Sequence, residues 1–447
     1  MNRREYLRLS GLALATSLAG CGRKPKKSKK ELLDPYRNRF DKIVDMGNKD
    51  VDQTGSEPIN SVITESLENQ TLLYFPSGTY RLSRLDLSNM TNCGLVGNQA
   101  TFLTPAKEQG NWIFGGSVQD LLIDGFTFDY TEPTAAPVIV FSVRGQRNIL
   151  RNLTFKGSRG SYPRSGLELK VPQSSASLLV DQLKMRGGSK NGSAIYTHPG
   201  EGRLRFVNCH IENWFEGLYA SPHSGPLIIN GGTYANNGID QVRIGGGESG
   251  ARVENATIRV SKPENKPNMR GIWLEEGTNA IIDNCSVEIT DLTGTNSSGG
   301  IVIGKQFGNA KITNTTIQTN HSIPGIHVRK PITEYDSTTM PSMPQLPSNH
   351  QVTCENIEIY GTAPGGTAIM LTDRDRCRFK SISIQHHFGK RHGITLKNVQ
   401  KSNIHDCQLR VSGTPIVSLD STPSTKNIET GGIGSLTYLS DSLRDMF

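Results

Sequence analysis

The amino-acid sequence predicts an all-β fold, a parallel β-solenoid of about 11–12 coils, and three observations support this prediction. Eleven short apolar segments, among them LIDGFTF and KITNTTI, repeat with a period of about 25 residues. A second set of short strands, such as SGLEL and DQVRI, lies between them. Gly and Asn punctuate the strands, and few apolar patterns have the length of a helix. Each coil of such a fold stacks only on its neighbours.

Every repeat has one turn position that lies shortly before an apolar residue. Asn is frequent there because it tolerates turn conformations, and its amides can stack in ladders from coil to coil. Cys209, Cys285 and Cys407 directly follow this position and are predicted to face the core, as the apolar residues of other coils do. The turn positions are Gly125, Asn152, Gln182, Asn208, Gly231, Asn255, Asn284, Asn314, Asn356, Ser381 and Asp406.

Residues 1–21 are predicted to be a targeting signal. They join a basic start, a short apolar stretch and a cleavage site of small residues. Arg3 and Arg4 begin a segment that resembles the twin-arginine export signal, and residues 18–21 resemble a lipobox in which Cys21 is lipidated. The apolar run is far shorter than the roughly 20 residues that cross a bilayer. We therefore expect twin-arginine export and a lipid anchor on the extracellular face of the cell membrane.

Residues 22–35 are predicted to be a basic tether. This segment either strengthens a weak single-lipid anchor by attraction to anionic headgroups or is a solvated spacer. Residues 1–30 hold nine of the 49 Lys and Arg residues and one of the 41 acidic residues, so 40 of each sign remain in residues 31–447. A neutral body gives no support for nucleic-acid binding, which needs a basic face on the folded domain. We expect a monomer.

Residues 36–82 are predicted to form an N-terminal cap and the first strand. Ile59, Val62, Ile63, Ser66 and Leu67 share one face of a helix that covers the open end of the solenoid. The segment LLYFPSGTYRL resembles the apolar-Phe-Pro-x-Gly-Thr-Tyr strand near the start of many right-handed β-helix proteins.

With the coil repeat, this segment makes most of residues 70–440 similar to the right-handed single-stranded parallel β-helix of the pectin-lyase-like superfamily. The export signal and the coils together are also similar to surface β-helix lipoproteins of halophilic archaea, although the neutral body lacks their acidity. The resemblance places the right-handed β-helix at residues 83–447. Residues 328–351 interrupt it with four prolines and no periodicity. This inserted loop either closes the C-terminal end of a groove or is an insertion without consequence.

One outward-facing column of the second strand set is rich in rings and charges, because side chains alternate across a strand. Its aromatic members offer faces for stacking on sugars, and its arginines are suited to carboxylates or sulfates. The alternative is that the aromatics reflect strand propensity alone. The column contains Glu168, Tyr196, Tyr219, Arg243, Trp273, Val302, His327, Met370 and Thr395. With neighbouring positions, the predicted substrate-binding residues are Glu168, Tyr196, His198, Tyr219, Arg270, Trp273, His327 and Arg329.

Two carboxylates, Glu216 and Asp240, occupy the same repeat position on consecutive coils, so their backbones should lie about 5 Å apart. Such proximity raises the pKa of one carboxyl, as in the acid and base pair of glycosidases. We expect Asp240 or Glu275 to be the general acid and Glu216 the base or nucleophile, with Arg243 holding substrate charge. The alternative is that Glu216 and Asp240 only form ion pairs with Arg243 and Arg270.

The enzyme families of this fold leave the reaction open. The chain lacks the Asn-Thr-Asp, Asp-Asp and Gly-His-Gly motifs of polygalacturonases and the Trp-x-Asp-His segment of calcium pectate lyases. NGIDQVRIG resembles an Asn-Gly-x-x-x-Ile-Arg-x-Gly stretch of alginate and chondroitin lyases, in which Arg243 matches their catalytic arginine, but their catalytic lysine has no counterpart.

The resulting prediction is an exported polysaccharide-binding protein that acts as a hydrolase or a lyase. A non-catalytic surface or adhesive protein that binds glycan is the alternative. No Cys or His spacing indicates a metal. The prediction includes no cofactor, except that a lyase would use Glu216, Asp240 and Glu275 to hold Ca²⁺.

Overall fold

The computed structural model describes residues 28–104, 112–132, 135–160, 163–262, 268–335 and 343–431. Contacts divide the chain into two units, Met1–Asn38 and Arg39–Phe447. In the first unit, α2 (Lys29–Leu33) and the short 3-10 helix η1 (Asp34–Tyr36) follow Ser28, whose side chain caps α2 together with Glu31. The end of the predicted tether is therefore helical, because this capping box satisfies the free amides of the first turn. The signal and Cys21 lie outside the described residues.

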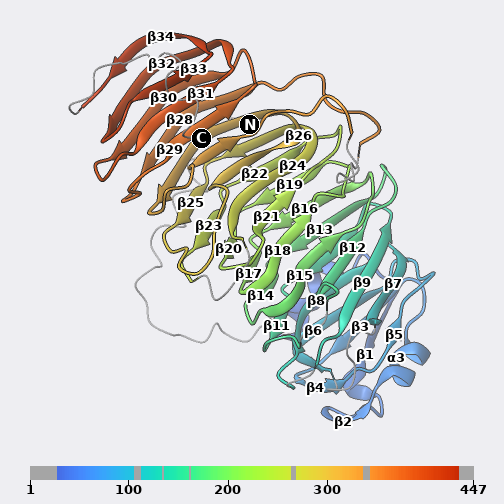
Figure 1. Cartoon of the computed structure of the whole chain (residues 1–447). Helices are drawn as coiled ribbons and strands as arrows, with labels where there is room; N and C mark the ends of the chain where they lie inside the picture. The colour runs from blue at the N-terminus through green and yellow to red at the C-terminus, as the bar shows by residue number, and fades with distance from the viewer. Residues whose placement is uncertain are drawn as a thin grey trace. The chain divides into compact units, whose positions relative to one another are not determined.

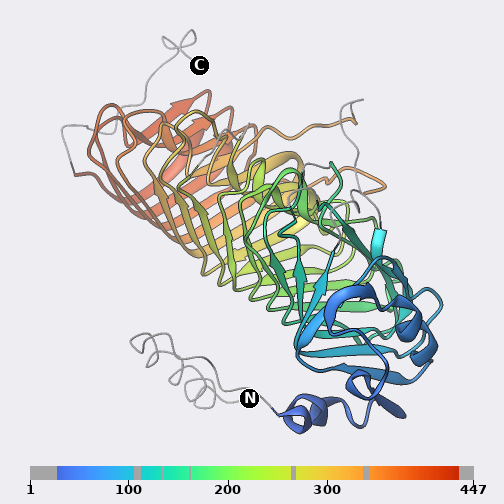
Figure 2. The ribbon, with the colours of Figure 1, turned by 90° about the horizontal axis from the view of Figure 1, so that it is seen from below.

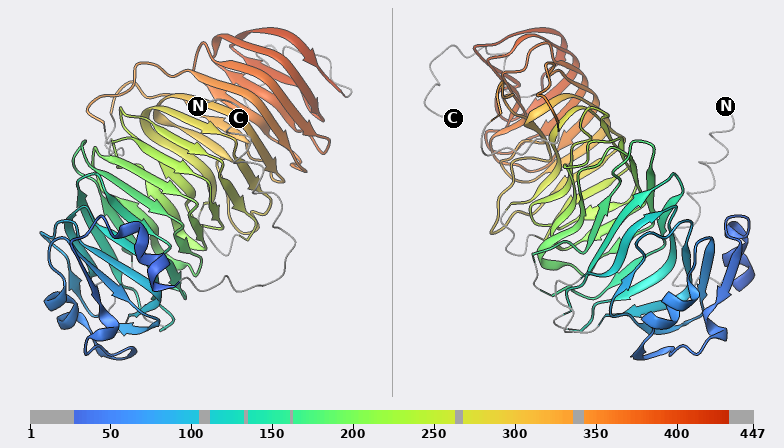
Figure 3. Two further views of the ribbon diagram at one scale, coloured as in Figure 1. Left: turned by 180° about the vertical axis from the view of Figure 1, so that it is seen from behind. Right: turned by 90° about the vertical axis from the view of Figure 1, so that its right-hand side faces the viewer.

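The second unit is a parallel β-solenoid of about 14 turns (Figure 1). Each turn adds one strand to each of up to three rows, and every pairing is parallel. Figures 2 and 3 show the stacked coils from further directions. The first row runs through β1 (Lys42–Asp45), β3 (Thr71–Phe75), β6 (Gly94–Leu103), β8 (Leu122–Asp129), β10 (Asn148–Arg151), β13 (Ser177–Asp181), β16 (Arg203–Val207), β19 (Leu227–Asn230), β22 (Ala251–Glu254), β24 (Arg270–Asp283), β26 (Ile301–Thr319), β28 (Val352–Tyr360), β30 (Arg378–His386), β32 (Gln400–Val411) and β34 (Thr422–Glu429).

The long strands of the first row bend, and most of them also contribute to the second row. The other strands of the second row are β2 (Thr54–Pro58), β4 (Gly78–Arg81), β11 (Thr154–Lys156), β14 (Lys184–Met185), β17 (His210–Glu212), β20 (Thr233–Ala235), β23 (Thr257–Val260) and β25 (Ser286–Ile289). The third row contains β5 (Leu85–Asp86), β7 (Trp112–Gln119), β9 (Val138–Arg144), β12 (Leu167–Lys170), β15 (Ser189–Thr197), β18 (Trp214–Ala220), β21 (Asp240–Ile244), the starts of β24 and β26, β27 (Ile326–Val328), β29 (Thr367–Thr372), β31 (His392–Lys397) and β33 (Ile416–Leu419).

The turn positions predicted from the sequence lie between the first and second rows, and all eleven have positive φ. Asn is favoured there because it adopts left-handed backbone conformations at low cost. Side-chain amides also bond between coils, from Asn284 Nδ2 to Asn255 Oδ1 at 2.7 Å and from Asn356 Nδ2 to Asn314 Oδ1 at 2.8 Å. The predicted ladder is therefore confirmed at these coils.

The number of coils exceeds the predicted 11–12, because residues 36–82 already form coils rather than only a cap. Strand β1 pairs with β3, and β2 pairs with β4. The repeat is hidden here because the 3-10 helix η2 (Met46–Asn48) and Pro76 replace the Asn and Gly turns of later coils. The predicted helix is present as α3 (Asn60–Ser66) in the first coil. It buries Ile59, Ile63 and Leu67, the face expected from the sequence.

One continuous apolar core runs through the coils. Phenylalanines stack from coil to coil in its N-terminal part, with the ring centroids of Phe102 and Phe126 4.6 Å apart, a contact worth about 1 kcal/mol beyond burial. The predicted inward cysteines, Cys209, Cys285 and Cys407, are buried and unpaired. In the described part of the chain, no helix is both long and apolar enough to span a membrane.

Candidate functional site

The outward column predicted from the sequence is in register on neighbouring strands of the third row. Cα partners join Glu168 to Tyr196, Tyr196 to Tyr219, Tyr219 to Arg243 and Arg243 to Trp273. These five residues, on β12, β15, β18, β21 and β24, are called the stripe below. The column continues through Val302, His327, Met370 and Thr395.

The N-terminal end of the stripe is an ion-pair cluster around Glu168. Arg164 donates two hydrogen bonds to the carboxylate of Glu168, at 3.0 and 2.7 Å, and His198 Nε2 lies 3.0 Å from it. Burial opposes ionisation, but the hydrogen bonds from His198 and Arg164 outweigh it and hold the pKa of Glu168 below its ordinary value. His198 also lies edge-on to Tyr196, with ring centroids 4.9 Å apart. Arg164 has no place in the strand pattern, and the sequence analysis missed it.

Arg243 is the centre of the stripe. Its guanidinium carbon lies 3.9 Å from the ring centroid of Tyr219 and 4.5 Å from that of Trp273. It donates to Glu275 at 2.6 and 2.5 Å and to Glu216 at 3.1 Å. The structure thus brings together three of the four predicted catalytic residues, with a cation between two carboxylates.

Asp240, the fourth predicted catalytic residue, lies beneath this surface. Its side chain has no exposed area, and both of its oxygens accept hydrogen bonds from Arg270, at 2.5 and 3.0 Å. Arg270 in turn covers Trp273, with its guanidinium carbon 3.5 Å from the ring centroid. Asp240 is therefore connected to the stripe only indirectly, because it binds Arg270, and Arg270 packs on Trp273. This geometry favours a supporting role for Asp240 over contact with substrate.

A buried amide network is formed by two residues close to Asp240 in the chain. Asn237 and Gln241 exchange hydrogen bonds at 2.8 and 2.9 Å, and Asn237 also accepts from the backbone amide of Trp214. Gly217 is required beside this network because a Cβ there would lie 2.3 Å from the carbonyl oxygen of Gln241. Neither Asn237 nor its fully buried partner Gln241 was among the site residues predicted from the sequence.

Two of the carboxyls hold protons unusually firmly. Burial raises the pKa of Asp240 to about 8 against the opposing charge of Arg270. Burial also raises the pKa of Glu216, although Arg243 and Ser193 oppose the shift. From the sequence, one raised pKa was expected in the pair Glu216 and Asp240. This upward shift favours Glu216 as an acid rather than as the base expected from the sequence.

The rings and arginines of the stripe already contact one another. The guanidinium groups of Arg243 and Arg270 lie on faces of Tyr219 and Trp273, so those faces are not open to a sugar. The same guanidinium groups are bonded to Glu216, Glu275 and Asp240. The sequence left open whether these carboxylates are catalytic or only form ion pairs. The predicted ion pairs do form, and they lie within an ordered, partly exposed site.

The C-terminal end of the column is different. His327 Nδ1 lies 2.9 Å from the carbonyl oxygen of Ser298, and burial lowers the pKa of His327. Beside it, Arg329 starts the inserted loop. The buried guanidinium of Arg374 donates to the carbonyl oxygens of Arg329, Gly304 and Gly308, at 2.8, 2.7 and 2.9 Å. Arg374 therefore fixes the start of the inserted loop against the third row. Closure of a groove by residues 328–351 stays a prediction.

The donor set does not fit the calcium ion of the lyase interpretation. Arg243 lies between Glu216 and Glu275, and Asp240 faces Arg270. Ca²⁺ takes six to eight oxygen ligands. The described residues contain no group of three or more His, Cys, Asp or Glu side chains with the spacing of a metal site.

Comparisons with known proteins agree with the architecture. Residues 189–331 match the family described as "right handed beta helix region". No curated protein matches the chain significantly.

Several solved structures are similar to the chain at low identity. The surface adhesin PfbA of Streptococcus pneumoniae is 14% identical, with 88% of this chain and 99% of that chain covered and a TM-score of 0.46. The mannuronan C-5 epimerase AlgE6 A-module of Azotobacter vinelandii is 13% identical, with 87% and 99% covered and a TM-score of 0.42. The catalytic unit of a GH87 alpha-1,3-glucanase from Streptomyces thermodiastaticus is 15% identical, with 88% and 69% covered and a TM-score of 0.34. At these values the similarity carries no argument about function.

Proposed function

Because this chain is a right-handed parallel β-helix protein, we propose that its stripe is a polysaccharide-binding site. The observation that carries the proposal is the register of Tyr196, Tyr219, Arg243 and Trp273 on four consecutive strands. Strands of one sheet lie about 4.8 Å apart, so the stripe offers a linear polymer one polar or aromatic side chain at each step along the sheet. The fold itself hosts many functions and does not choose between enzyme and adhesin.

The charge balance of the stripe favours a neutral glycan. Arg243 and Arg270 already share three carboxyls, two of them with raised pKa, and a further anion would compete with these contacts. The carboxylate of Glu275, whose side chain is 18% exposed, can accept hydrogen bonds from sugar hydroxyls. The half-buried rings of Tyr196 and Trp273 supply apolar contact for the sugar ring.

Cleavage by hydrolysis is a second candidate function, favoured by the state of Glu216. This carboxyl has a raised pKa and shares the guanidinium of Arg243 with Glu275. Paired carboxyls with unequal affinity for protons serve as acid and base in glycosidases. In this proposal Glu216 protonates the leaving oxygen, Glu275 is the base or nucleophile, and Arg243 keeps the two apart. Asp240 supports the site through Arg270.

The test is binding of the full-length protein to neutral, uronic and sulfated polysaccharides, with new reducing ends and the ultraviolet absorbance of unsaturated products followed in parallel. We expect binding to a neutral member of the panel. Trp273→Ala should weaken it about 30-fold, as for a central aromatic contact. Phe388→Ala is the matched control, because Phe388 is 56% exposed and outside the stripe.

Each outcome separates the two functions. Absence of binding across the panel, or equal losses in Trp273→Ala and Phe388→Ala, would reject the site. Reducing ends that disappear in both Glu216→Gln and Glu275→Gln, with binding retained, would support hydrolysis. Binding without reducing ends would leave a recognition protein. Products that absorb in the ultraviolet would show a lyase and reject the acid–base pair.

We also propose that residues 1–21 export the protein and that Cys21 carries its lipid anchor. The support is the sequence of the signal. Cys21→Ser should release the protein from the membrane fraction into the medium, and replacement of Arg3 and Arg4 by Lys should block export. Retention of Cys21→Ser in the membrane fraction would contradict the anchor.

A further inference from the structure

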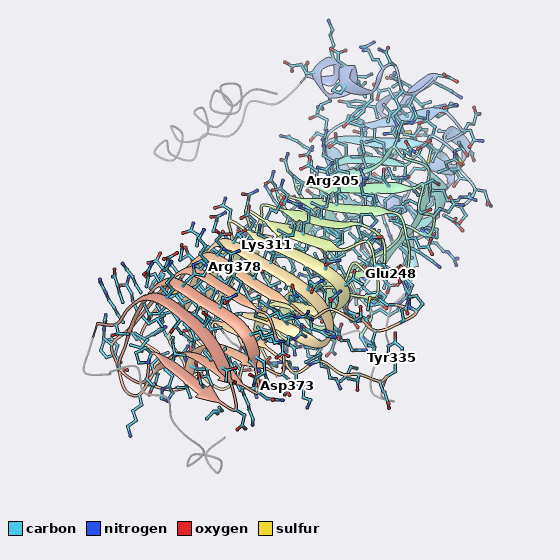
Figure 4. All side chains as sticks on the ribbon, turned by 90° about the horizontal axis from the view of Figure 1, so that it is seen from above. Arg205, Glu248, Lys311, Tyr335, Asp373 and Arg378 are labelled. Atoms are coloured by element: carbon cyan, nitrogen blue, oxygen red, sulfur yellow. The ribbon has the colours of Figure 1, made fainter. Side chains whose placement is uncertain are left out.

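A second face of the solenoid, on the first row, presents basic side chains at every other coil. Cα pairing runs from Arg205 through Ile228, Arg252, Ile281, Lys311 and Thr353 to Arg378. The four cations, Arg205, Arg252, Lys311 and Arg378, are exposed and are called the basic row. Figure 4 shows Arg205, Lys311 and Arg378 in this order along one side of the coils, with Glu248, Tyr335 and Asp373 along another. The cations therefore stand about 10 Å apart, twice the spacing of neighbouring strands.

Acidic side chains beside the basic row are already bonded. Glu254 accepts from Arg252 at 2.9 Å, and Glu355 lies 3.1 Å from Lys380, which is outside the row. Asp283 accepts from Thr313 and Asn314 at 2.6 and 2.8 Å. Among the described residues, the side chains of Arg205 and Lys311 form no hydrogen bond or ion pair. Arg205 and Lys311 thus keep positive charge that no ion pair neutralises, whereas Arg252 shares its charge with Glu254.

A hollow of about 230 Å³ lies in the middle of the basic row. Ile228 and Ile281 line it on either side of Arg252, and Pro226, Ala251 and Asn279 complete much of its wall. Its lining is mainly apolar, and one guanidinium stands beside it. An apolar hollow of this size with an adjacent cation suits the C–H face of one sugar ring that carries, or adjoins, a carboxylate.

We propose that the basic row binds a linear acidic polysaccharide with one negative charge on alternate sugars. An extended pyranose unit advances about as far as one coil, so charges on alternate sugars meet cations on alternate coils. The sugars between them lie over Ile228, Ile281 and Thr353. This site is on the first row, apart from the stripe on the third row, and it does not depend on the function proposed for the stripe.

The experiment measures binding of the full-length protein to hyaluronan, whose carboxylates occur on alternate sugars, at about 50 mM salt, where charges are weakly screened. Variant Arg205→Gln/Lys311→Gln/Arg378→Gln should weaken binding about tenfold, the effect of three exposed ion pairs. The matched control, Lys49→Gln/Lys184→Gln/Lys390→Gln, removes the same charge from exposed positions outside the row and should change affinity less than twofold. Ile281→Glu, which places an acid in the hollow, should also weaken binding.

Four results would overturn the proposal. Equal losses in the two triple variants would mean attraction by net charge alone. Stronger binding of oligothymidylate than of hyaluronan would assign the row to nucleic acid. Undiminished binding of hyaluronan by Ile281→Glu would exclude the hollow, and loss of hyaluronan binding in Trp273→Ala would place that ligand on the stripe. Circular dichroism of each variant shows whether the fold is retained, and the three Gln substitutions are at exposed positions that no core contact requires.

Discussion

The stripe and the basic row occupy the same scaffold and use charge in opposite ways. The coils on either side of Arg243 carry acids beside the stripe, so strand spacing brings Arg243 into contact with Glu216 and Glu275. In the basic row, isoleucine or threonine separates the cations, so strand spacing holds like charges about 10 Å apart. The order of residues across coils therefore decides whether charges satisfy one another or remain available to a ligand.

The largest effect that separates the two regions is expected on stability. Asp240→Ala leaves the buried Arg270 without its partner, and we expect the free energy of unfolding to fall by about 3–5 kcal/mol. Glu254→Ala, which removes the ion-pair partner of the exposed Arg252, should cost less than about 1 kcal/mol. Urea denaturation of the two variants measures the difference. Equal losses of unfolding free energy in the two variants would show that the buried pair of Asp240 and Arg270 contributes no more to stability than an exposed pair does.

The pH dependence of stability sharpens the same contrast. The raised pKa of Asp240, about 8 against an ordinary 3.8, means that the folded protein holds this proton more tightly than the unfolded chain does. Its contribution is complete at low pH and is lost as the pH rises from about 4 to about 8. Wild type should therefore lose stability relative to Asp240→Asn over this window, by at most about 1.4 kcal/mol per pH unit.

Glu168 supplies the control of opposite sign. Its pKa is lowered by hydrogen bonds from His198 and Arg164 against the effect of burial. Its contribution is present above the ordinary pKa of 4.5 and is lost as the pH falls below it. Wild type should lose stability relative to Glu168→Gln in acid. The same sign for both variants in urea titrations across pH would contradict the assignment of these environments.

The affinities of the two sites should depend differently on salt concentration. Raising the salt from about 50 to about 500 mM should weaken hyaluronan binding at the basic row about tenfold, because exposed charges are screened. Binding of a neutral glycan at the stripe should change less than twofold, since its charges pair within the protein. Titrations at both salt concentrations measure the difference. Similar salt dependence at the two sites would remove the distinction between them.

The smallest expected effect is an increase in affinity. Glu355→Gln removes an acid next to the basic row and should raise the affinity for hyaluronan about twofold, the scale of one exposed charge. Glu288→Gln, on the second row, should leave it unchanged. A decrease in Glu355→Gln would show that this carboxylate contacts the ligand.

The sequence predicted the scaffold where local chemistry repeats. The turn residues from Gly125 to Asp406 are predictable because left-handed turns favour Asn and Gly, which occupy eight of the eleven positions. The same alignment places Glu168 beside Tyr196 and Arg243 beside Trp273. The first coils escaped detection because their turns use other residues. Contacts that leave the strand period, such as Arg164 with Glu168 or Arg374 with Gly304, were not predictable from it. Asp240 is buried beneath Arg270, which packs on Trp273. An alignment of the repeats does not predict such an arrangement of side chains.

Arg374 fixes the point in the solenoid at which the inserted loop leaves, so the length of that loop can vary. Its guanidinium binds the carbonyl oxygen of Arg329, where the inserted loop begins, and those of Gly304 and Gly308 on the preceding coil. The departure point is thus fixed by a residue that lies outside the loop. Closing a longer loop costs little additional entropy. The inserted loop, residues 328–351, is therefore a suitable position for exchanging or grafting sequence, because β26 and β28 pair in register on either side of it.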